Sequence, residues 1–195
     1  MRWDDLFDDL EAQLDQELRA GGDERAREAE RLRVARLGLR ERLDAMGTRT
    51  PLDLVLHDGS SLRLSMGSLG RDWLAGEVGA EEPETPDRGL IVPFAAIAAI
   101  RVDRESVVER SLAHRETPAA SLAPRIGLGF VLRDLARRRR AVDVLTRAGR
   151  WHGTIDRVGT DHLDLAVHER SVPRRRTEVR EIRLVPFIGL LSVLL

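Results

Sequence analysis

The stretches LIVPFAAIAAI (Leu90–Ile100) and RLVPFIGLLSV (Arg183–Val193) repeat one phrase. In each, Val-Pro-Phe is followed by apolar residues at matched offsets, and each closes a long segment of the chain. Self-similarity at a fixed spacing is typical of duplicated structural units. We therefore interpret the two stretches as the ends of two copies of one module.

The segments before the two phrases agree in order as well as in residues. Apolar residues alternate with a period of two, which indicates strands, and Asp58-Gly59 has the chemistry of a tight hairpin turn. Further short strands are predicted up to each phrase. The matching pairs are LDLVLHDG (52–59) with VDVLTRAG (142–149), and SLGRDWLAGEV (68–78) with RVGTDHLDLAV (157–167).

Helical patterns precede both copies. Apolar residues at three- and four-residue steps predict an acidic amphipathic helix at the N-terminus, which Gly21 and Gly22 interrupt. A second helix is predicted over 24–46 and a third over 127–139. The buried stripe of the second helix is predicted to be Leu32, Leu39, Leu43 and Met46.

A family resemblance rests on GTIDRVGTDHLDL (Gly153–Leu165), which has a Gly in a bent second strand, an apolar pair, an Asp and an alternating third strand. This stretch resembles the first signature of the Sm-like fold, and the two Val-Pro-Phe phrases resemble that family's closing element, a tight turn between strands four and five. The chain is thus similar to tandem Sm-like (LSm or SH3-like small β-barrel) domains. Gly153 has no direct equivalent in the first copy, where Leu64 or Ser65 falls and Gly67 or Gly70 would take over.

The predicted fold class is α+β, mainly β. It comprises two tandem small five-stranded bent-sheet barrels, each preceded by a helix, behind the N-terminal amphipathic helix. The predicted divisions are 1–22 for that helix, 23–105 for the first helix and barrel, 106–123 for a linker, and 124–195 for the second helix and barrel.

Alternation along the strands predicts which side chains face the core. Leu163, Leu165 and Val167 are expected inside, with His162, Asp164 and His168 outside. His162 and His168 are nevertheless expected near His152, if the second and third strands pair. Strand five of each copy should bury Ile97 and Ile100, or Leu190 and Val193, and the apolar C-terminus FIGLLSVLL must be covered.

Composition narrows the function classes. The 195 residues include no Cys, which excludes disulfides, thiol catalysis and Cys-ligated zinc. No apolar run approaches the roughly 20 residues of a membrane span, so we predict a cytoplasmic protein without membrane contact. Phosphate-binding loops, nucleophile elbows and His-Glu-x-x-His are absent from the sequence. No enzyme activity, cofactor or metal site is therefore predicted.

Every basic residue is Arg, which can grip phosphate bidentately. In RNA-binding members of the family, an Asp-x-Asn and a basic pair hold the base. This chain keeps Asp72 and Asp161 but lacks the Asn and the basic pair, so that site is predicted to be absent. Two arginine clusters remain, either as nucleic-acid-binding residues or as solvated surface: Arg137, Arg138, Arg139 and Arg140, and Arg174, Arg175 and Arg176.

Protein contacts are the favoured prediction. The apolar face of the first helix either packs on the chain's own barrel or docks a partner, through Trp3, Leu6, Phe7, Leu10 and Leu14. Exposed edges of strands four and five offer a second surface. The loop AEEPETPDRG (80–89) in copy one is acidic where the equivalent loop of copy two, 173–180, is basic; the opposite charges either let one barrel meet another, within or between chains, or belong to two solvated loops. We predict a non-catalytic interaction or scaffold protein that forms homo-oligomers; the alternative is RNA or DNA binding by the arginines.

Overall fold

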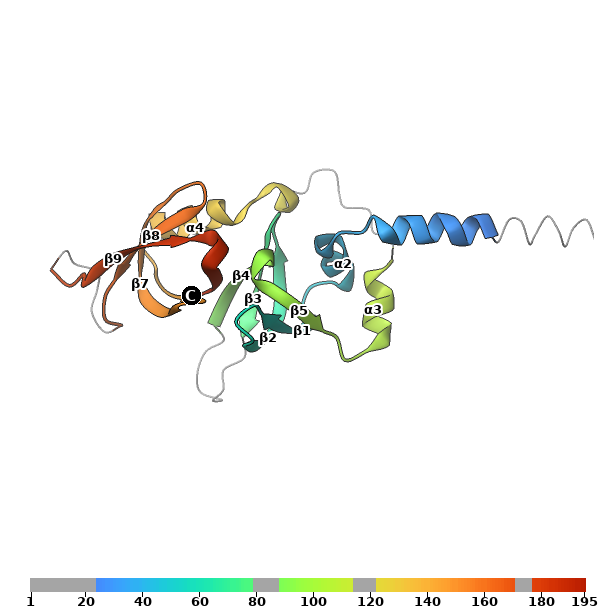
Figure 1. Cartoon of the computed structure of the whole chain (residues 1–195), viewed down its shortest axis with the longest axis horizontal. Helices are drawn as coiled ribbons and strands as arrows, with labels where there is room; N and C mark the ends of the chain where they lie inside the picture. The colour runs from blue at the N-terminus through green and yellow to red at the C-terminus, as the bar shows by residue number, and fades with distance from the viewer. Residues whose placement is uncertain (1–23, 79–87, 114–121, 171–176) are drawn as a thin grey trace, which may run out of the picture. The chain divides into compact units, whose positions relative to one another are not determined.

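The computed structural model describes residues 24–78, 88–113, 122–170 and 177–195 (Figure 1). The chain divides into two compact units, Met1–Leu39 and Arg40–Leu195. All strands of the described residues belong to the second unit. No helix in these residues is long and apolar enough to cross a membrane.

The second unit contains two sets of five strands in the same order. The first half holds β1 (Pro51–Leu56), β2 (Ser61–Leu69), β3 (Trp73–Val78), β4 (Arg88–Pro93) and β5 (Ile97–Arg101). The second half holds β6 (Ala141–Thr146), β7 (Gly149–Val158), β8 (His162–Val167), β9 (Glu181–Pro186) and β10 (Leu190–Leu194). One 3₁₀ turn joins the fourth and fifth strands of each half, η1 (Phe94–Ala96) and η3 (Phe187–Gly189). Each Val-Pro-Phe phrase therefore ends a strand and starts a tight turn, as predicted.

The described strands form one antiparallel sheet in the order β5-β1-β2-β3-β4-β10-β6-β7-β8-β9. Each half keeps the order fifth, first, second, third and fourth strand, and the halves join where β4 pairs with β10. The fold is therefore mixed α+β and mainly β. The sequence repeat did not predict this join, because it depends on contacts between residues about 100 positions apart.

Both second strands contain a register shift, between Met66 and Ser68 in β2 and between Ile155 and Arg157 in β7. Such bulges bend a strand. The backbone of β8 also approaches Gly153, where a Cβ would lie 2.3 Å from the Ala166 oxygen. In the first half the corresponding crowding occurs at Gly76 of β3, where a Cβ would lie 2.3 Å from the Ser65 oxygen.

Two helices precede the first half where the sequence predicted one. Residues 24–35 are helical, the chain turns at 36–38, and α2 (Leu39–Met46) begins after Gly38. The predicted buried stripe is therefore half wrong: Leu43 and Met46 are buried, but Leu32 and Leu39 are exposed. The predicted stripe assumed one continuous helix over 24–46, and the interruption at Gly38 means that Leu32 no longer lies on the same helical face as Leu43 and Met46.

Three further helical elements follow in the sequence. Helix α4 (Leu128–Arg138) confirms the prediction of a helix before the second half, and it packs on β7. Helix α3 (Glu105–Ser111) begins at the last residue of the first predicted module and continues into the residues predicted as a linker, and η2 (Ala123–Arg125) comes just before α4. The linker prediction missed α3 because its seven residues carry no strong helical periodicity.

Two clusters of buried side chains fill the halves. The first core gathers Leu43, Leu54, Leu64 and Leu74 with their neighbours, and the second core gathers Leu132, Val144, Ile155 and Leu163 with theirs. The predicted core residues Leu163, Leu165, Leu190 and Val193 are buried, while Ile97 and Ile100 are half-buried against the first core. The C-terminal stretch is covered as expected, except for Ile188.

Candidate functional site

Strand β4 has a partner on each side. Its residues pair with β3, and Ile91 and Leu90 also lie opposite Val193 and Leu194 of β10. The amide of Leu195 continues the ladder by donating to the Gly89 oxygen at 2.8 Å. At this junction the halves exchange apolar side chains, because Ile91 packs in the second core and Leu191 in the first.

The equivalent strand of the second half, β9, has no such cover. In the described residues it pairs only with β8. The phrase Leu90-Ile91-Val92-Pro93 aligns with Arg183-Leu184-Val185-Pro186, so Leu184 corresponds to Ile91. Leu184 is 68% exposed, whereas Ile91 is 3% exposed. Ile182 is also exposed, so β9 presents two large exposed apolar side chains on a strand with an open edge, and Ile188 is exposed in the η3 turn that follows.

A cavity of about 480 Å³ borders β9 beside the β6–β7 turn. Its lining includes Trp151, Arg183 and Leu184. The Arg183 guanidinium lies 4.3 Å from the centroid of the Trp151 ring, which is a cation–π contact, and Arg183 also bonds to Glu181. The β9 edge therefore combines apolar side chains with one internally paired cation.

The opposite edge of the sheet is β5, which pairs only with β1 within the described part of the chain. Its residues Ala98 and Ala99 are exposed, at the positions where β10 has Leu191 and Ser192. One edge of the sheet thus presents bulky apolar side chains, and the other presents small ones.

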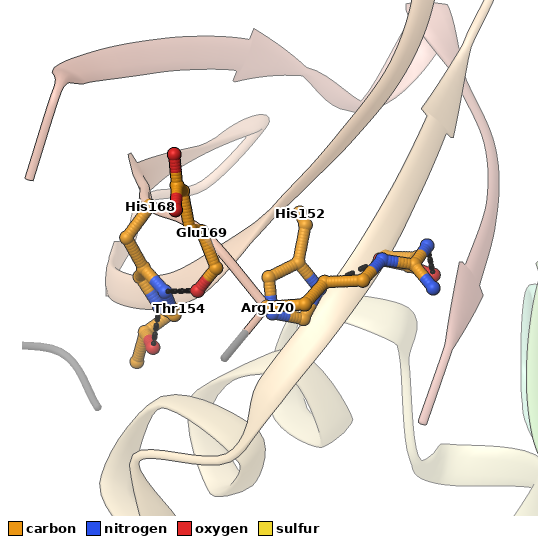
Figure 2. Close-up of polar contacts among 6 residues, drawn as sticks. His152, Thr154, His168, Glu169 and Arg170 are labelled. Atoms are coloured by element: carbon orange, nitrogen blue, oxygen red, sulfur yellow. Dashed lines mark hydrogen bonds and ion pairs between the residues drawn. The ribbon is translucent and has the colours of Figure 1, made fainter. Parts of the chain in front are cut away.

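A second candidate site is a polar cluster in the second half (Figure 2). His152 Nδ1 lies 2.7 Å from Asp143 Oδ1, and Arg170 binds the other oxygen of that carboxylate. His168 Nδ1 donates to the Glu169 carbonyl at 2.9 Å, so its Nε2 accepts from the Thr154 hydroxyl at 2.9 Å. The two imidazole rings meet edge to face, 5.3 Å apart.

The geometry of this cluster favours a structural role. A Ser-His-Asp type of relay needs one histidine between the acid and the hydroxyl, but Asp143 contacts His152 whereas Thr154 contacts His168. Thr154 and His168 are buried, which keeps a substrate from the hydroxyl. No group of three or more His, Cys, Asp or Glu residues in the described ranges could hold a metal ion. The cluster instead ties β6 and β7 to the end of β8.

The predicted histidine arrangement is partly wrong. His152 and His168 do meet, but His162 bonds to its neighbour Asp161 at 2.9 Å. That hydrogen bond lowers the pKa of the Asp161 carboxyl, which remains ionised. His168 was expected outside and is buried; Ala166, on the same side of β8, is also fully buried, so this side of the strand is covered towards its end.

The arginine cluster that the structure describes lies at the end of α4. Arg137 and Arg138 both bond to Asp134, and these bonds lower the pKa of that carboxyl. Arg139 adopts a left-handed conformation, φ 52°, and ends the helix. Half of this cluster is thus paired locally. Nucleic-acid binding by Arg137, Arg138, Arg139 and Arg140 stays a prediction.

Several predicted site residues lie outside the described residues. They are the N-terminal set Trp3, Leu6, Phe7, Leu10 and Leu14, the cluster Arg174, Arg175 and Arg176, and most of the acidic loop. Comparison with known protein families, curated proteins and solved structures finds no match for the chain.

The exposed residues of β9 were missed as site residues, although the sequence carried a signal. Strand β4 reads Leu-Ile-Val, a continuous apolar run typical of a strand covered on both faces. Strand β9 reads Glu-Ile-Arg-Leu-Val, in which charged and apolar residues alternate as in a strand with one open face. The buried polar cluster left no such signal, because it joins residues from separate strands.

Proposed function

We propose that this chain is a non-catalytic interaction protein, made of two Sm-like small-barrel modules, that self-associates through the two edges of its sheet. The β4–β10 junction carries this proposal. Within one chain, the fourth strand of one half is covered by the fifth strand of the other. Strands β9 and β5 are the same two kinds of strand, each with one partner in the described residues. The β5 edge of a second copy is therefore the fitting occupant of the β9 edge.

The module assignment draws support from features that both halves share. A helix precedes each set of five strands, the second strand is bulged, and a 3₁₀ turn separates strands four and five. The first strand pairs with both the second and the fifth, as β1 does with β2 and β5. A small barrel needs this pairing, because its sheet must curl until the fifth strand reaches the first.

The internal junction suggests the register between copies. Val193 opposes Ile91 there, and the equivalent pair is Ile100 of the second copy opposite Leu184. Two residues along, Val102 opposes Ile182 in place of Leu195 opposite Gly89. Both pairs bury apolar area that is exposed or half-exposed in the single chain.

One contact in this register is unfavourable. Arg101 of the second copy opposes Arg183, and like charges across a strand pair are destabilising. The bond to Glu181 and the stacking on Trp151 partly compensate the charge of Arg183. Salt screens the remaining repulsion, so association should hold or strengthen as salt rises. Nucleic-acid binding by arginines would weaken steeply under the same change.

The test compares two matched variants by sedimentation velocity over a range of concentrations. Leu184→Asp places a charge on the β9 edge, and Leu122→Asp makes the same change at a side chain of similar exposure, 67%, which precedes η2 and belongs to neither edge strand. We expect the wild type and Leu122→Asp to associate and Leu184→Asp to remain monomeric. A monomeric wild type, or association that Leu184→Asp leaves unchanged, would overturn the proposal.

The N-terminal residues supply a second, independent part of this proposal. The apolar face that includes Trp3 and Phe7 fits a docking helix for a protein partner. Deleting residues 1–20 should reduce partner recovery or the oligomeric mass. If both are unchanged, the helix does not act as a docking element, and the edge contact stands on its own test.

A further inference from the structure

The junction between the halves contains a second contact besides the paired strands. The segment Arg125–Leu128 lies on the turn that connects β2 and β3. The Ile126 carbonyl accepts from the Arg71 amide at 2.9 Å and from the Trp73 indole N–H at 3.0 Å. The Leu128 amide donates to Asp72 Oδ1 at 2.7 Å. Asp72 thus caps the first turn of α4 from the other half of the molecule.

The segment that docks at this junction is itself repeated. Arg125-Ile126-Gly127-Leu128 precedes α4, and Arg36-Leu37-Gly38-Leu39 precedes α2 in the same way. In both copies the Leu that starts the helix is followed four residues later by a Leu with no exposed surface, Leu132 or Leu43. The first copy therefore carries nearly the same sequence, with Leu37 in place of Ile126, at the same place in its module.

The turn that receives the segment is also repeated. Gly70 donates its amide to the Trp73 oxygen at 2.9 Å, and Gly159 donates to the His162 oxygen at the same distance. The next contact is kept as well, because the Asp72 and Asp161 carbonyls accept from Phe94 and Phe187. The two turns share a backbone arrangement and place an aspartate at the same position.

Close approach explains why glycines recur on both sides of the contact. A Cβ on Gly127 would lie 2.7 Å from the Arg71 guanidinium, and a Cβ on Gly70 would lie 2.7 Å from the Ile126 oxygen. The repeat keeps both glycines, as Gly38 and Gly159. A side chain at Gly70 would hold the docked segment away from the turn, whereas one at Gly127 would require only that the flexible Arg71 side chain move.

The repeated segment Arg36–Leu39 and the repeated turn Gly159–His162 differ in exposure from the segment Arg125–Leu128 and the turn between β2 and β3. Leu128 is 5% exposed against the second core, while Leu39 is 44% exposed. The Asp161 carboxylate projects into solvent and bonds only to the neighbouring His162 among the described contacts. Within the described residues, the Leu39 side chain and the Asp161 carboxylate are thus accessible for a contact between chains.

We infer that the Arg36–Leu39 segment of one copy docks on the Gly159–His162 turn of the next copy, with Asp161 capping α2. The partner is a second copy of this chain, and the inference rests on the head-to-tail association proposed above. The Thr160 amide donates to the Leu37 carbonyl, and Asp161 accepts from the Leu39 amide. His162 replaces the indole of Trp73 with another ring N–H donor. Repeating one such contact produces a closed ring or an open filament.

Cross-linking tests the contact directly, because the chain contains no Cys and only introduced thiols react. Two single variants, Leu37→Cys and Thr160→Cys, are mixed and treated with a short bis-maleimide. The matched control is one chain that carries both Ile126→Cys and Arg71→Cys, the equivalent positions inside the molecule. We expect a covalent dimer from the mixture and neither variant alone, and a cross-link within one chain from the control.

A second measurement, the dissociation constant of the oligomer, isolates the contribution of Asp161 from that of the rest of the interface. Asp161→Ala removes the cap and should raise the dissociation constant of the oligomer roughly fivefold, whereas Asp161→Asn keeps a capping side chain and should retain tight association. Adding Leu184→Asp should abolish the intermolecular cross-link.

The outcomes distinguish this inference from the proposal on which it rests. If Leu184→Asp dissociates the oligomer while the mixture forms no cross-link and Asp161→Ala has no effect, the docking of Arg36–Leu39 is wrong and the edge pairing stands. If the wild type is monomeric, both are wrong.

Discussion

Strands β4 and β9 share a position in the repeat and the phrase Val-Pro-Phe, yet one lies inside the sheet and the other at its edge. The immediate cause is β10, which covers β4 and contributes apolar side chains to both cores. Pro93 is buried and Pro186 exposed for the same reason. The comparison teaches that exposure in a duplicated module depends on its neighbour as much as on its own residues.

The two strands also differ in the residues that a neighbour would meet. Glu181 and Arg183 stand where β4 has Arg88 and Leu90, so β9 carries charge along its open edge. Charged residues on an edge strand limit indiscriminate pairing. Ile182 and Leu184, which alternate with these charged residues, can still make apolar contacts with a strand that pairs in a suitable register. The apolar residues of β9 therefore allow another strand to pair with this edge, and its charged residues limit which strands can do so.

The largest expected effect comes from the same truncation at the equivalent residues of the two strands. Ile91→Ala should lower the free energy of unfolding by about 2–5 kcal/mol, because it leaves a cavity between the two halves. Leu184→Ala should change it by about 0.5 kcal/mol or less in dilute, monomeric protein. Urea unfolding measures both. Equal losses would show that β9 is covered in the monomer, which would break the comparison.

An intermediate effect is expected at the glycines of the second strands. Gly153→Ala should cost about 1–3 kcal/mol, because the new methyl group would press on the Ala166 carbonyl. Gly67→Ala makes only an ordinary contact, 3.5 Å from the Ala75 oxygen, and should be neutral or stabilising by up to about 1 kcal/mol. Thermal unfolding under identical conditions ranks the pair. A larger loss of stability for Gly67→Ala than for Gly153→Ala would show that the close backbone approach occurs at Gly67 and not at Gly153.

The smallest effect concerns the two aspartates of the repeated turns. Asp72→Ala should destabilise the monomer by about 1 kcal/mol, since Asp72 caps α4 within the chain. Asp161→Ala should leave monomer stability unchanged and act only on association. Denaturant midpoints at low protein concentration measure the contrast. A loss at Asp161 equal to that at Asp72 would indicate that Asp161 already caps a helix inside the single chain.

Local patterns predicted much of the fold. Period-two alternation located the strands, and Asp58-Gly59 marked the first hairpin, where Gly59 adopts φ +84°. The helix over 24–46 was predicted as continuous because a single Gly in a helical pattern is often tolerated, and here it marks a boundary. The polar cluster and the junction were not predictable, since Asp143 meets Arg170, and β4 meets β10, only through pairing of distant segments.

The sequence by itself determined the duplication, the order of the strands and the turn after each Val-Pro-Phe phrase. These follow from periodicity and from residues that favour particular backbone angles, which act over a few positions. Only the tertiary structure decided which fourth strand is covered and that the Arg125–Leu128 segment contacts a turn of the other half. The reason is that both copies offer nearly the same elements, and one chain can satisfy only one of the two possible junctions.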